Sequence, residues 1–461
     1  MRAILEIPLT LGEIIEAIGA FAPQAEKDIV ITAITTDTRD MQQGDLFIAL
    51  PGENFDGEWF CEDAKRAKCS FISAKNKSGI LTNSTREAIL QIISLYKSKL
   101  KNLKCTIAIT GSVGKSTTKE FLKALIKNNA KVHATHDNYN NYIGLAHTVF
   151  TAASDTEYLI AELGTNHTGE IEEMSKALKP DVAIITKIGT SHIGNFGSRE
   201  MIAKAKLEIL HGLSENGVLL IPHGEDFLSV TRNSKTVSTT DISADYYLLQ
   251  NETKAMKTEF VFFRDSQKIC NAKVDILGSG NMKALAFAIS CAYEIGFNKD
   301  KIFGSISNIT AEITRQNVFY WNDITIIDDS FNASLESAIV GFEFMKFYPG
   351  RRCAVLGDFL ELGAQTEIIH FKIGAEAANH GIELLFIFGV YAPFIARGAA
   401  YAGMPKENIY INTDITDKST TLNQIISKAH KNDVLLFKAS KKRNFTELCN
   451  ELKRRGKQNA G

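Results

Sequence analysis

The sequence lacks the features of a secreted or membrane-inserted protein. Its seven cysteines are scattered and odd in number, and none forms a C-x-x-C pair or lies beside a histidine cluster, so neither a disulfide framework nor a cysteine-based metal site is expected. The opening "MRAILEIPLTLGEIIEAIG" has no uninterrupted apolar core, because Glu6 and Glu13 break it. The most apolar later stretch, "LLFIFGVYAPFIA", is too short to cross a bilayer. We expect a cytoplasmic protein without membrane insertion.

An excess of charge of either sign is also missing. Fifty-two lysines and arginines face 53 aspartates and glutamates, which gives a formal net charge of -1. No overall field therefore draws the chain to nucleic acid or to an anionic membrane, and we expect no nucleic-acid partner. Any site for an anion has to be local.

The 461 residues, 44% of them hydrophobic, are enough for two or three cores. The first hundred read as a small α/β unit, with a helix expected at 11–18 and short strands in "DIVITAITT" and "GDLFIAL". From Lys104 onward, apolar strands alternate with amphipathic helices, which predicts βαβ units and a parallel sheet. A second such series begins near residue 315. The fold class predicted is α/β in three domains: a small α/β domain at 1–100, a central phosphate-loop ATPase domain with a parallel sheet at 101–312, and a Rossmann-like α/β domain at 313–461.

The stretch "IAITGSVGKSTTKEFL", residues 107–122, has the spacing of a phosphate loop. Gly111 and Gly114 stand between an apolar strand and a helix that begins near Lys115, where backbone N–H groups and a helix N-terminus can hold an anion. Lys115 is expected to reach the outer phosphates, and the hydroxyl of Ser116 or Thr117 to touch a magnesium ion. Ile109 occupies the place of the first glycine of the full motif, so the loop is a shortened variant.

Three further residues follow strands of the same predicted sheet. Glu162 ends the strand "YLIAEL", His192 lies on the loop "KIGTSHIGNFGS", and the helix "REMIAKAKLEIL" carries Lys204 and Lys206 on different faces. A carboxylate and an imidazole suit a metal or a phosphate partner. A surface glutamate, a solvated histidine and a solvated basic helix fit the same spacing, and spacing alone does not separate these interpretations.

Six segments together resemble the Mur ligases. They are "TGSVGKST", "NYNNYIGLAHTV", "AELGTNHTGEI", "SHIGNFGSREMIAKAKLEI", "IIDDSFNAS" and "VLGDFLELG", and "TDTRDMQQGDLFIALPGENFDG" near the start is similar to the family's uridine-nucleotide-binding domain. The similarity spans nearly the whole chain in the family's order. It implies an ATP- and magnesium-dependent amide ligase of peptidoglycan synthesis, with a UDP-linked muramoyl tripeptide and D-alanyl-D-alanine as the expected partners. Nothing in the sequence demands more than a monomer.

The resemblance also implies roles for particular residues. Lys115 would bind the transferred phosphate, and Lys115, His192 and Lys206 are the expected catalytic residues. Two magnesium ions are expected, with Ser116, Glu162, His192 and a carbamylated Lys206 as their ligands. The expected UDP-substrate residues are Asp37, Thr38 and Arg39. The expected ATP-binding residues are Thr110, Gly111, Ser112, Val113, Gly114, Lys115, Ser116, Thr117, Asn138, Asn141, Arg315, Asp329 and Asn332; Asn140 belongs to the same asparagine loop.

Four positions depart from the family's pattern. Pro222 stands in place of an asparagine, Gly280 in place of a histidine, Leu335 in place of a proline, and Ala439 in place of the glycine of a closing "KGSR". An amide ligase of the same construction that acts on a different acid or amine therefore remains an alternative, although "TDTR" and "GDLFIALPGENFDG" favour a UDP-linked substrate. A nucleotide-binding scaffold without turnover would be expected to lose Lys115, Glu162, His192 or Lys206, and all four are present.

Overall fold

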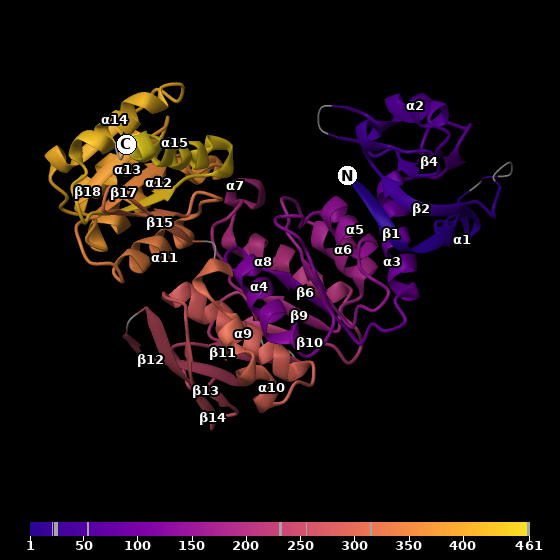
Figure 1. Cartoon of the computed structure of the whole chain (residues 1–461), viewed down its shortest axis with the longest axis horizontal. Coiled ribbons are helices and arrows are strands. Elements are labelled where there is room, and N and C mark those ends of the chain that lie inside the picture. Colours follow the sequence, from indigo (N-terminus) through magenta and orange to yellow (C-terminus); the bar gives the residue numbers. More distant parts are fainter. Residues whose placement is uncertain are drawn as a thin grey trace.

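The described residues form three sheets, each with its own helices. The computed structural model describes residues 1–20, 22, 26–52, 55–229, 233–254, 256–313 and 316–458. Figure 1 shows the N-terminal sheet in indigo and the C-terminal sheet in yellow at opposite ends of the molecule, with the large central sheet between them. We refer to the three parts as the N-terminal, central and C-terminal domains. The boundaries at 100/101 and 312/313 stay predictions.

The N-terminal sheet has the order β1-β2-β3-β4-β5. Its first pair is antiparallel and the others are parallel. A capping box between Thr10 and Glu13 starts the first helix, where the sequence predicts one. The elements are β1 (Arg2–Thr10), α1 (Leu11–Ala17), β2 (Val30–Thr35), β3 (Leu46–Ile48), α2 (Cys61–Arg66), β4 (Ser70–Ser73), β5 (Ile80–Leu81) and α3 (Thr85–Lys99).

The central sheet has the order β14-β13-β12-β11-β10-β9-β6-β8-β7. Its strands are parallel from β7 to β12, and β12, β13 and β14 are antiparallel. The strands are β6 (Cys105–Thr110), β7 (Val132–Ala134), β8 (Tyr158–Glu162), β9 (Val182–Ile185), β10 (Val218–Pro222), β11 (Ser234–Ser238), β12 (Tyr246–Lys254), β13 (Lys257–Arg264) and β14 (Gln267–Val274). The helices are α4 (Lys115–Ile126), α5 (Tyr142–Phe150), α6 (Glu170–Leu178), α7 (Ile193–Phe196), α8 (Arg199–Leu207), α9 (Ser279–Glu294) and α10 (Lys299–Gly304).

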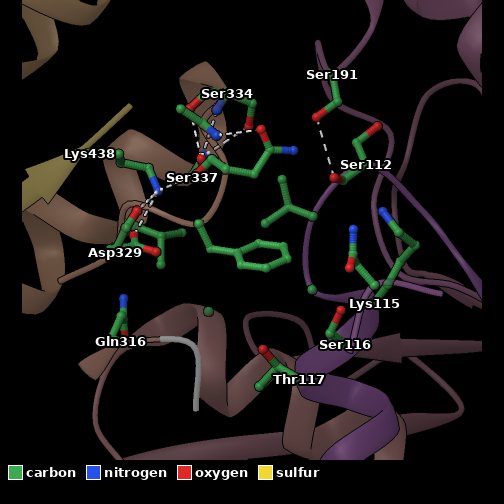
Figure 2. A pocket seen from close by; sticks show the side chains of 18 of the residues that line it. Ser112, Lys115, Ser116, Thr117, Ser191, Gln316, Asp329, Ser334, Ser337 and Lys438 are labelled. Atoms are coloured by element: carbon green, nitrogen blue, oxygen red, sulfur yellow. Dashed lines mark hydrogen bonds and ion pairs between the residues drawn. The ribbon is translucent and has the colours of Figure 1, made fainter. Parts of the chain in front are cut away.

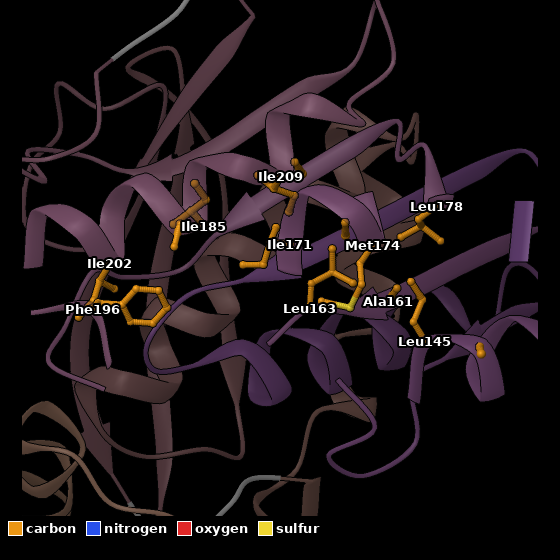
Figure 3. Close-up of a cluster of buried hydrophobic side chains, with 14 of the residues drawn as sticks. Leu145, Ala161, Leu163, Ile171, Met174, Leu178, Ile185, Phe196, Ile202 and Ile209 are labelled. Carbon is orange, nitrogen blue, oxygen red and sulfur yellow. The ribbon is translucent and has the colours of Figure 1, made fainter. Parts of the chain in front are cut away.

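Helices cover both faces of the central sheet. Phe121 of α4 and Phe287 of α9 share one buried cluster with the strands. Figure 3 shows the other cluster, in which Leu145 of α5, Ile171 of α6 and Ile202 of α8 pack toward the sheet. Because both faces are buried, the parallel strands are apolar nearly throughout, as the sequence predicts. The carboxyl ends of β6, β7, β8 and β9 therefore meet at one edge, and the polar residues that follow them lie together.

The C-terminal sheet has the order β15-β16-β20-β17-β18-β19, and only β15 runs antiparallel to its neighbour. Its strands are β15 (Asn317–Trp321), β16 (Ile324–Asp328), β17 (Arg352–Gly357), β18 (Leu384–Phe388), β19 (Ile409–Asn412) and β20 (Val434–Lys438). Its helices are α11 (Leu335–Met345), α12 (Thr366–Asn379), α13 (Ala392–Tyr401), α14 (Lys418–Lys428) and α15 (Phe445–Gln458). The two parallel series predicted from the sequence are confirmed, whereas the antiparallel strands β12–β14 and β15 were not predicted. Among the described residues, no helix combines the length and the apolar character needed to cross a membrane.

Candidate active site

The phosphate-loop sequence lies where β6 ends and α4 begins. The loop after β9 supports it through three hydrogen bonds: the Ser112 N–H donates to the Lys187 carbonyl at 2.8 Å, the Thr186 hydroxyl to the Val113 carbonyl at 2.6 Å, and the Gly189 N–H to the Ser112 hydroxyl at 2.9 Å. The Lys115 ammonium folds back and donates to the Gly111 carbonyl at 2.7 Å. The loop is thus held in place by the neighbouring strand, with its hydroxyls and lysine at the mouth of a cavity.

Three predicted residues meet directly behind this loop. The Ser116 hydroxyl donates to Oε2 of Glu162 at 2.6 Å, and the Asn140 side-chain amide donates to Oε1 at 3.0 Å. Glu162 is buried at the end of β8, and these contacts hold its carboxylate in one orientation. A hydroxyl and a carboxylate oxygen at this separation are hard oxygen donors of the kind that Mg²⁺ prefers. The donor set therefore fits a magnesium ion.

The three asparagines of the predicted nucleotide-facing loop have different contacts. Asn138 and Asn140 line the cavity. Asn141 instead caps helix α5, because its side-chain oxygen accepts from the Gly144 N–H at 2.9 Å. Asn140, which the sequence placed in the loop without a specific contact, is the residue that orients Glu162.

Lys206 is buried although Lys204, two residues earlier, is exposed and paired with Glu200 at 3.2 Å. The two lysines thus lie on different faces of α8, as their spacing predicts. Burial, followed by repulsion from Lys115, lowers the pKa of Lys206 to about 7, and the carboxylates of Glu208, Glu170 and Glu162 act in the opposite direction. The solvated-helix interpretation is therefore wrong for Lys206 and correct for Lys204.

His192 stands at the contact between the central and C-terminal domains. It immediately precedes α7, with a left-handed backbone (φ 61°). Its Nδ1 lies 2.5 Å from Oε2 of Glu361, which follows β17 in the C-terminal domain. The neighbouring Ser191 lines the same cavity as Ser116 and Glu162.

The C-terminal domain supplies the opposite wall of the cavity. The Lys438 ammonium, at the end of β20, donates to Oδ2 of Asp329 at 2.7 Å and to the Asn332 carbonyl at 3.3 Å. Lys438 is 1% exposed and Asp329 13%, so the pair is almost fully desolvated. Asp329 and Asn332, two of the predicted ATP-binding residues, both line the cavity.

Figure 2 shows Lys115 and Ser116 on one side of this cavity and Lys438 and Asp329 on the other. The enclosed volume is about 200 Å³. Several lining residues were missed at the sequence level; they are Ser191, Asn281, Gln316, Phe331, Ser334, Ser337 and Lys438. Only Lys438 carried a signal, namely a lysine at the carboxyl end of a parallel strand.

His192 and Lys206 are not among the lining residues of this cavity. Of the predicted ATP-binding residues, four either do not line it or lie outside the described residues. The Thr110 hydroxyl is buried and donates to the Leu163 carbonyl at 2.7 Å, so its role is to join β6 to β8. Gly111 lies beneath the loop, and its carbonyl receives the Lys115 ammonium. Asn141 is the cap already described, and Arg315 lies outside the described residues.

The three predicted UDP-substrate residues lie in the N-terminal domain after β2. The Arg39 guanidinium donates to both Asp37 oxygens, at 2.9 and 2.6 Å, and holds the pKa of that carboxyl well below its usual range. Thr38 begins the short turn of helix between them. The arginine is 86% exposed and available to a ligand.

The four departures from the family's pattern have local structural explanations. Gly280 lies in the first turn of α9, where a Cβ atom would come within 2.8 Å of Val340 of α11, so the glycine allows the C-terminal domain to approach. Leu335 begins α11 after the capping residue Ser334, a position that a proline also suits. Ala439 is buried against Gly357, and Pro222 ends β10.

The sheets and the cavity define a three-domain α/β protein with a phosphate-loop sequence facing a second α/β domain. Family models match in the same order: "Mur ligase family, catalytic domain" over residues 30–96, "Mur ligase middle domain" over 109–292, and "Mur ligase, glutamate ligase domain" over 312–441. The chain belongs to the Mur ligase family and is a ligase.

Individual relatives match over almost the full length. The chain is 32% identical to the UDP-N-acetylmuramoyl-tripeptide–D-alanyl-D-alanine ligase of Bacillus subtilis, covering 97% of this chain and 98% of that one. Among solved structures, MurF from Acinetobacter baumannii matches with a TM-score of 0.87, 25% identity and coverage of 97% and 99%. MurF ligase from Thermotoga maritima, in complex with ADP, matches with a TM-score of 0.79, 25% identity and coverage of 92% and 98%. The predicted family and three-domain fold are thus confirmed.

Proposed function

We propose that this chain uses ATP to join D-alanyl-D-alanine to a UDP-linked muramoyl tripeptide in the synthesis of peptidoglycan. The full-length similarity to the Bacillus subtilis ligase supports the choice of substrates. The observation that carries the chemistry is the contact of Ser116 with Glu162 beside Lys115, at the edge of the cavity between two domains. We further propose that the chain works in the cytoplasm as a monomer.

ATP is the proposed phosphate donor, and its phosphates would bind the loop 110–117 and Lys115. Ser116 and Glu162 would hold one magnesium ion, and His192 with Lys206 a second. Bound magnesium supplies positive charge to a transferring phosphoryl group. The ADP complex of the Thermotoga maritima structure supports the nucleotide assignment. Three residues that line the same cavity would contact the nucleotide, namely Asn138, Asp329 and Asn332. Arg315 is proposed as a fourth on resemblance alone. The shape of the loops would depend on Thr110, Gly111 and Asn141.

Lys206 is the proposed site of a carbamate. A neutral amine forms a C–N bond with carbon dioxide and releases one proton, which converts the lysine into an oxygen ligand. The burial of Lys206, which lowers its pKa, and its proximity to Glu162 support this assignment. A Lys206→Ala variant with full activity, or wild-type activity that does not depend on dissolved carbon dioxide, would contradict it.

The residues of the chain then have defined tasks. Lys115 neutralises charge on the phosphoryl group as the terminal carboxylate of the tripeptide is phosphorylated. The amine of the dipeptide attacks the resulting acyl phosphate, a C–N bond forms, and phosphate leaves. The C-terminal wall around Lys438 and Asp329 closes the cavity and excludes the water that would hydrolyse the acyl phosphate. Asp37, Thr38 and Arg39 would bind the uridine nucleotide.

Phosphate release from ATP tests this function. The purified chain is supplied with the UDP-linked tripeptide, with D-alanyl-D-alanine, and with both, and the product mass is measured. Release that requires both substrates, with a product heavier by the dipeptide, is the expected result. Release that requires a different acid or amine would identify the alternative, a related amide ligase. It would direct attention to Pro222, Gly280 and Leu335, where the sequence departs from the family's pattern. Failure to release phosphate with any acid and amine pair would overturn the assignment.

A further inference from the structure

The central and C-terminal domains touch at a backbone contact beside His192. The Gly194 N–H of α7 donates to the Glu361 carbonyl at 2.9 Å. A Cβ atom on Gly194 would lie 2.5 Å from the Gly363 nitrogen, closer than atoms can pack. Figure 1 shows α7 at this point, on the side of the central domain that faces the C-terminal domain. A glycine is therefore required at 194 for the two backbones to come this close.

Two residues at this contact have a left-handed backbone without being glycine. They are His192, with φ 61°, and Glu361, with φ 65°. Such conformations cost free energy and persist where the surroundings impose them, frequently at functional sites. Here the two strained residues come from different domains, and their side chains meet.

One nitrogen of the His192 ring, Nδ1, requires a hydrogen-bond partner. This nitrogen is buried and has no hydrogen bond of suitable angle within the described residues. Oε2 of Glu361, 2.5 Å away, is the acceptor at hand.

The loop that carries His192 is also held at its other end by the C-terminal domain. The carboxylate of Glu336, in the first turn of α11, accepts from the Thr190 N–H at 2.8 Å and from the Thr190 hydroxyl at 3.0 Å. Two glutamates of one domain therefore fix residues 190–192 of the other. The position of the His192 ring depends on how the domains are arranged.

A histidine that binds a metal generally has its second ring nitrogen held by a carboxylate, which orients the ring. We propose that Glu361 is a positioning residue for His192: by holding Nδ1 from the C-terminal domain it presents Nε2 as the ligand atom, so that the second metal ion binds tightly only when the domains are together. This inference rests on the proposed function, in which His192 is a metal ligand. It makes domain closure a condition for assembling the site.

A purely structural ion pair is the competing interpretation. The His192 side chain is 27% exposed and that of Glu361 41%, and ion pairs at such exposure contribute little to stability. That interpretation does not explain why the backbone is strained at two facing residues or why the two domains meet at a glycine. It also predicts no effect of Glu361 on metal binding, so the two interpretations can be separated.

Metal binding can be measured without turnover. The full chain, loaded with a non-hydrolysable ATP analogue, is titrated with Mn²⁺, and free Mn²⁺ is followed by electron paramagnetic resonance. We expect two ions in the wild type. In Glu361→Ala we expect the affinity of the weaker ion to fall about 10- to 100-fold, the range for losing such an orienting partner, with the tighter ion unchanged. Glu361→Gln keeps an acceptor oxygen and should retain part of the affinity.

Two further variants complete the design. Glu367→Gln removes a charge from an exposed position of α12 and should match the wild type. Gly194→Ala keeps Glu361 but blocks the backbone contact, so it should weaken the same ion. Unchanged affinity for both ions in Glu361→Ala would overturn the proposal, and so would a wild type that binds a single ion. Neither acid nor amine is present in this titration, so an error in the proposed substrates would appear only in the ligation assay.

Discussion

The two walls of the cavity are built in different ways. On the central side, Ser116 lies at the start of α4 after β6, Asn140 in the loop after β7, and Glu162 at the end of β8. These three strands are adjacent in one sheet, and Ser116 and Asn140 both contact Glu162. On the C-terminal side, Lys438 and Asp329 form a buried pair of their own, but their distance from the central wall depends on contacts between domains. One wall is preformed by a single sheet, and the other has to be brought to it.

This difference separates two kinds of contribution to activity. A contact within the central wall exists in every arrangement of the domains, so changing it should alter the chemistry and leave the overall shape intact. Contacts such as those of Glu336 and Glu361 exist only when the domains are together. Changing them should alter the shape, and alter the chemistry only through it.

The largest effect is expected from the preformed wall. Lys115→Ala should lower kcat by about 10²- to 10³-fold, the usual cost of removing one preorganised charge partner from a transition state. Lys115 lies beside its own loop at 2.7 Å from the Gly111 carbonyl, so the domain arrangement should not change. Steady-state kinetics measures the loss, and small-angle X-ray scattering checks the shape. Lys127→Ala, in the exposed turn after α4, is the control, and a changed scattering profile in Lys115→Ala would break the distinction between the walls.

The second effect concerns the stability of the C-terminal wall of the cavity. Lys438→Met removes the ammonium group that contacts the nearly buried Asp329, and removing one member of such a pair costs about 3–5 kcal/mol in the free energy of unfolding. Lys431→Met is the matched control, because its pair with Asp323 is exposed at 72% and 66% and should contribute little. Urea denaturation measures both variants. Equal stability of the two would mean that solvent screens the Lys438 pair.

The third effect tests closure itself. Glu336→Gln weakens two hydrogen bonds to Thr190, and one hydrogen bond to a charged group contributes about 1.5 kcal/mol, so kcat/KM should fall roughly tenfold. The scattering profile in the presence of a non-hydrolysable ATP analogue should show a more extended molecule than the wild type. Glu367→Gln is the control here as well. A tenfold loss of activity with an unchanged profile would place Glu336 in the chemistry instead of in closure.

The sequence predicted the preformed central wall of the cavity better than the C-terminal wall, for a physical reason. Glycine spacing, a strand and a helix encode the phosphate loop locally, and strand ends indicate the sheet edge at which Glu162 lies. Helical periodicity places Lys204 and Lys206 on different faces of α8, but it does not say which of the two is buried. The pairing of Lys438 with Asp329 joins residues 109 positions apart, and no local pattern specifies such a contact.

Contacts between domains are still less visible in the sequence. Glu361 belongs to a recognisable motif, yet its contact with His192 depends on the orientation of two separate sheets. The sequence also did not indicate that Asn141, a residue of the expected loop, caps helix α5. Antiparallel strands β12–β14 were missed because their mixed pattern resembles loop as much as strand.

The smallest effect is a pH dependence that arises from one histidine of the C-terminal domain. His370 of α12 is fully buried; its Nε2 accepts from the Phe359 N–H at 3.0 Å, and its Nδ1 lies 2.7 Å from the Thr366 carbonyl. Burial lowers the pKa of His370 below 6.5, although the Thr366 carbonyl and the Asp358 carboxylate oppose the shift. The Tyr391 ring, 4.8 Å away between centroids, packs against the imidazole without adding charge. His370 therefore holds the backbone of the loop that carries Glu361, and it does so in its neutral form.

The sign follows from proton binding. Below about pH 6.5 the unfolded chain binds a proton at His370, whereas the folded domain does not. The stability that the neutral imidazole contributes is therefore complete above that pH. It is lost as the pH falls toward the lower pKa of the folded state. The free energy of unfolding should therefore be lower below about pH 6.5 than above it. Urea denaturation at about pH 7.5 and about pH 5.5 measures this difference. In His370→Gln, which keeps an acceptor for the Phe359 N–H, the free energy of unfolding should depend less on pH. The control variant His136→Gln, at an exposed position, should match the wild type. Equal pH slopes in wild type and His370→Gln would contradict a contribution of the neutral His370 side chain to stability.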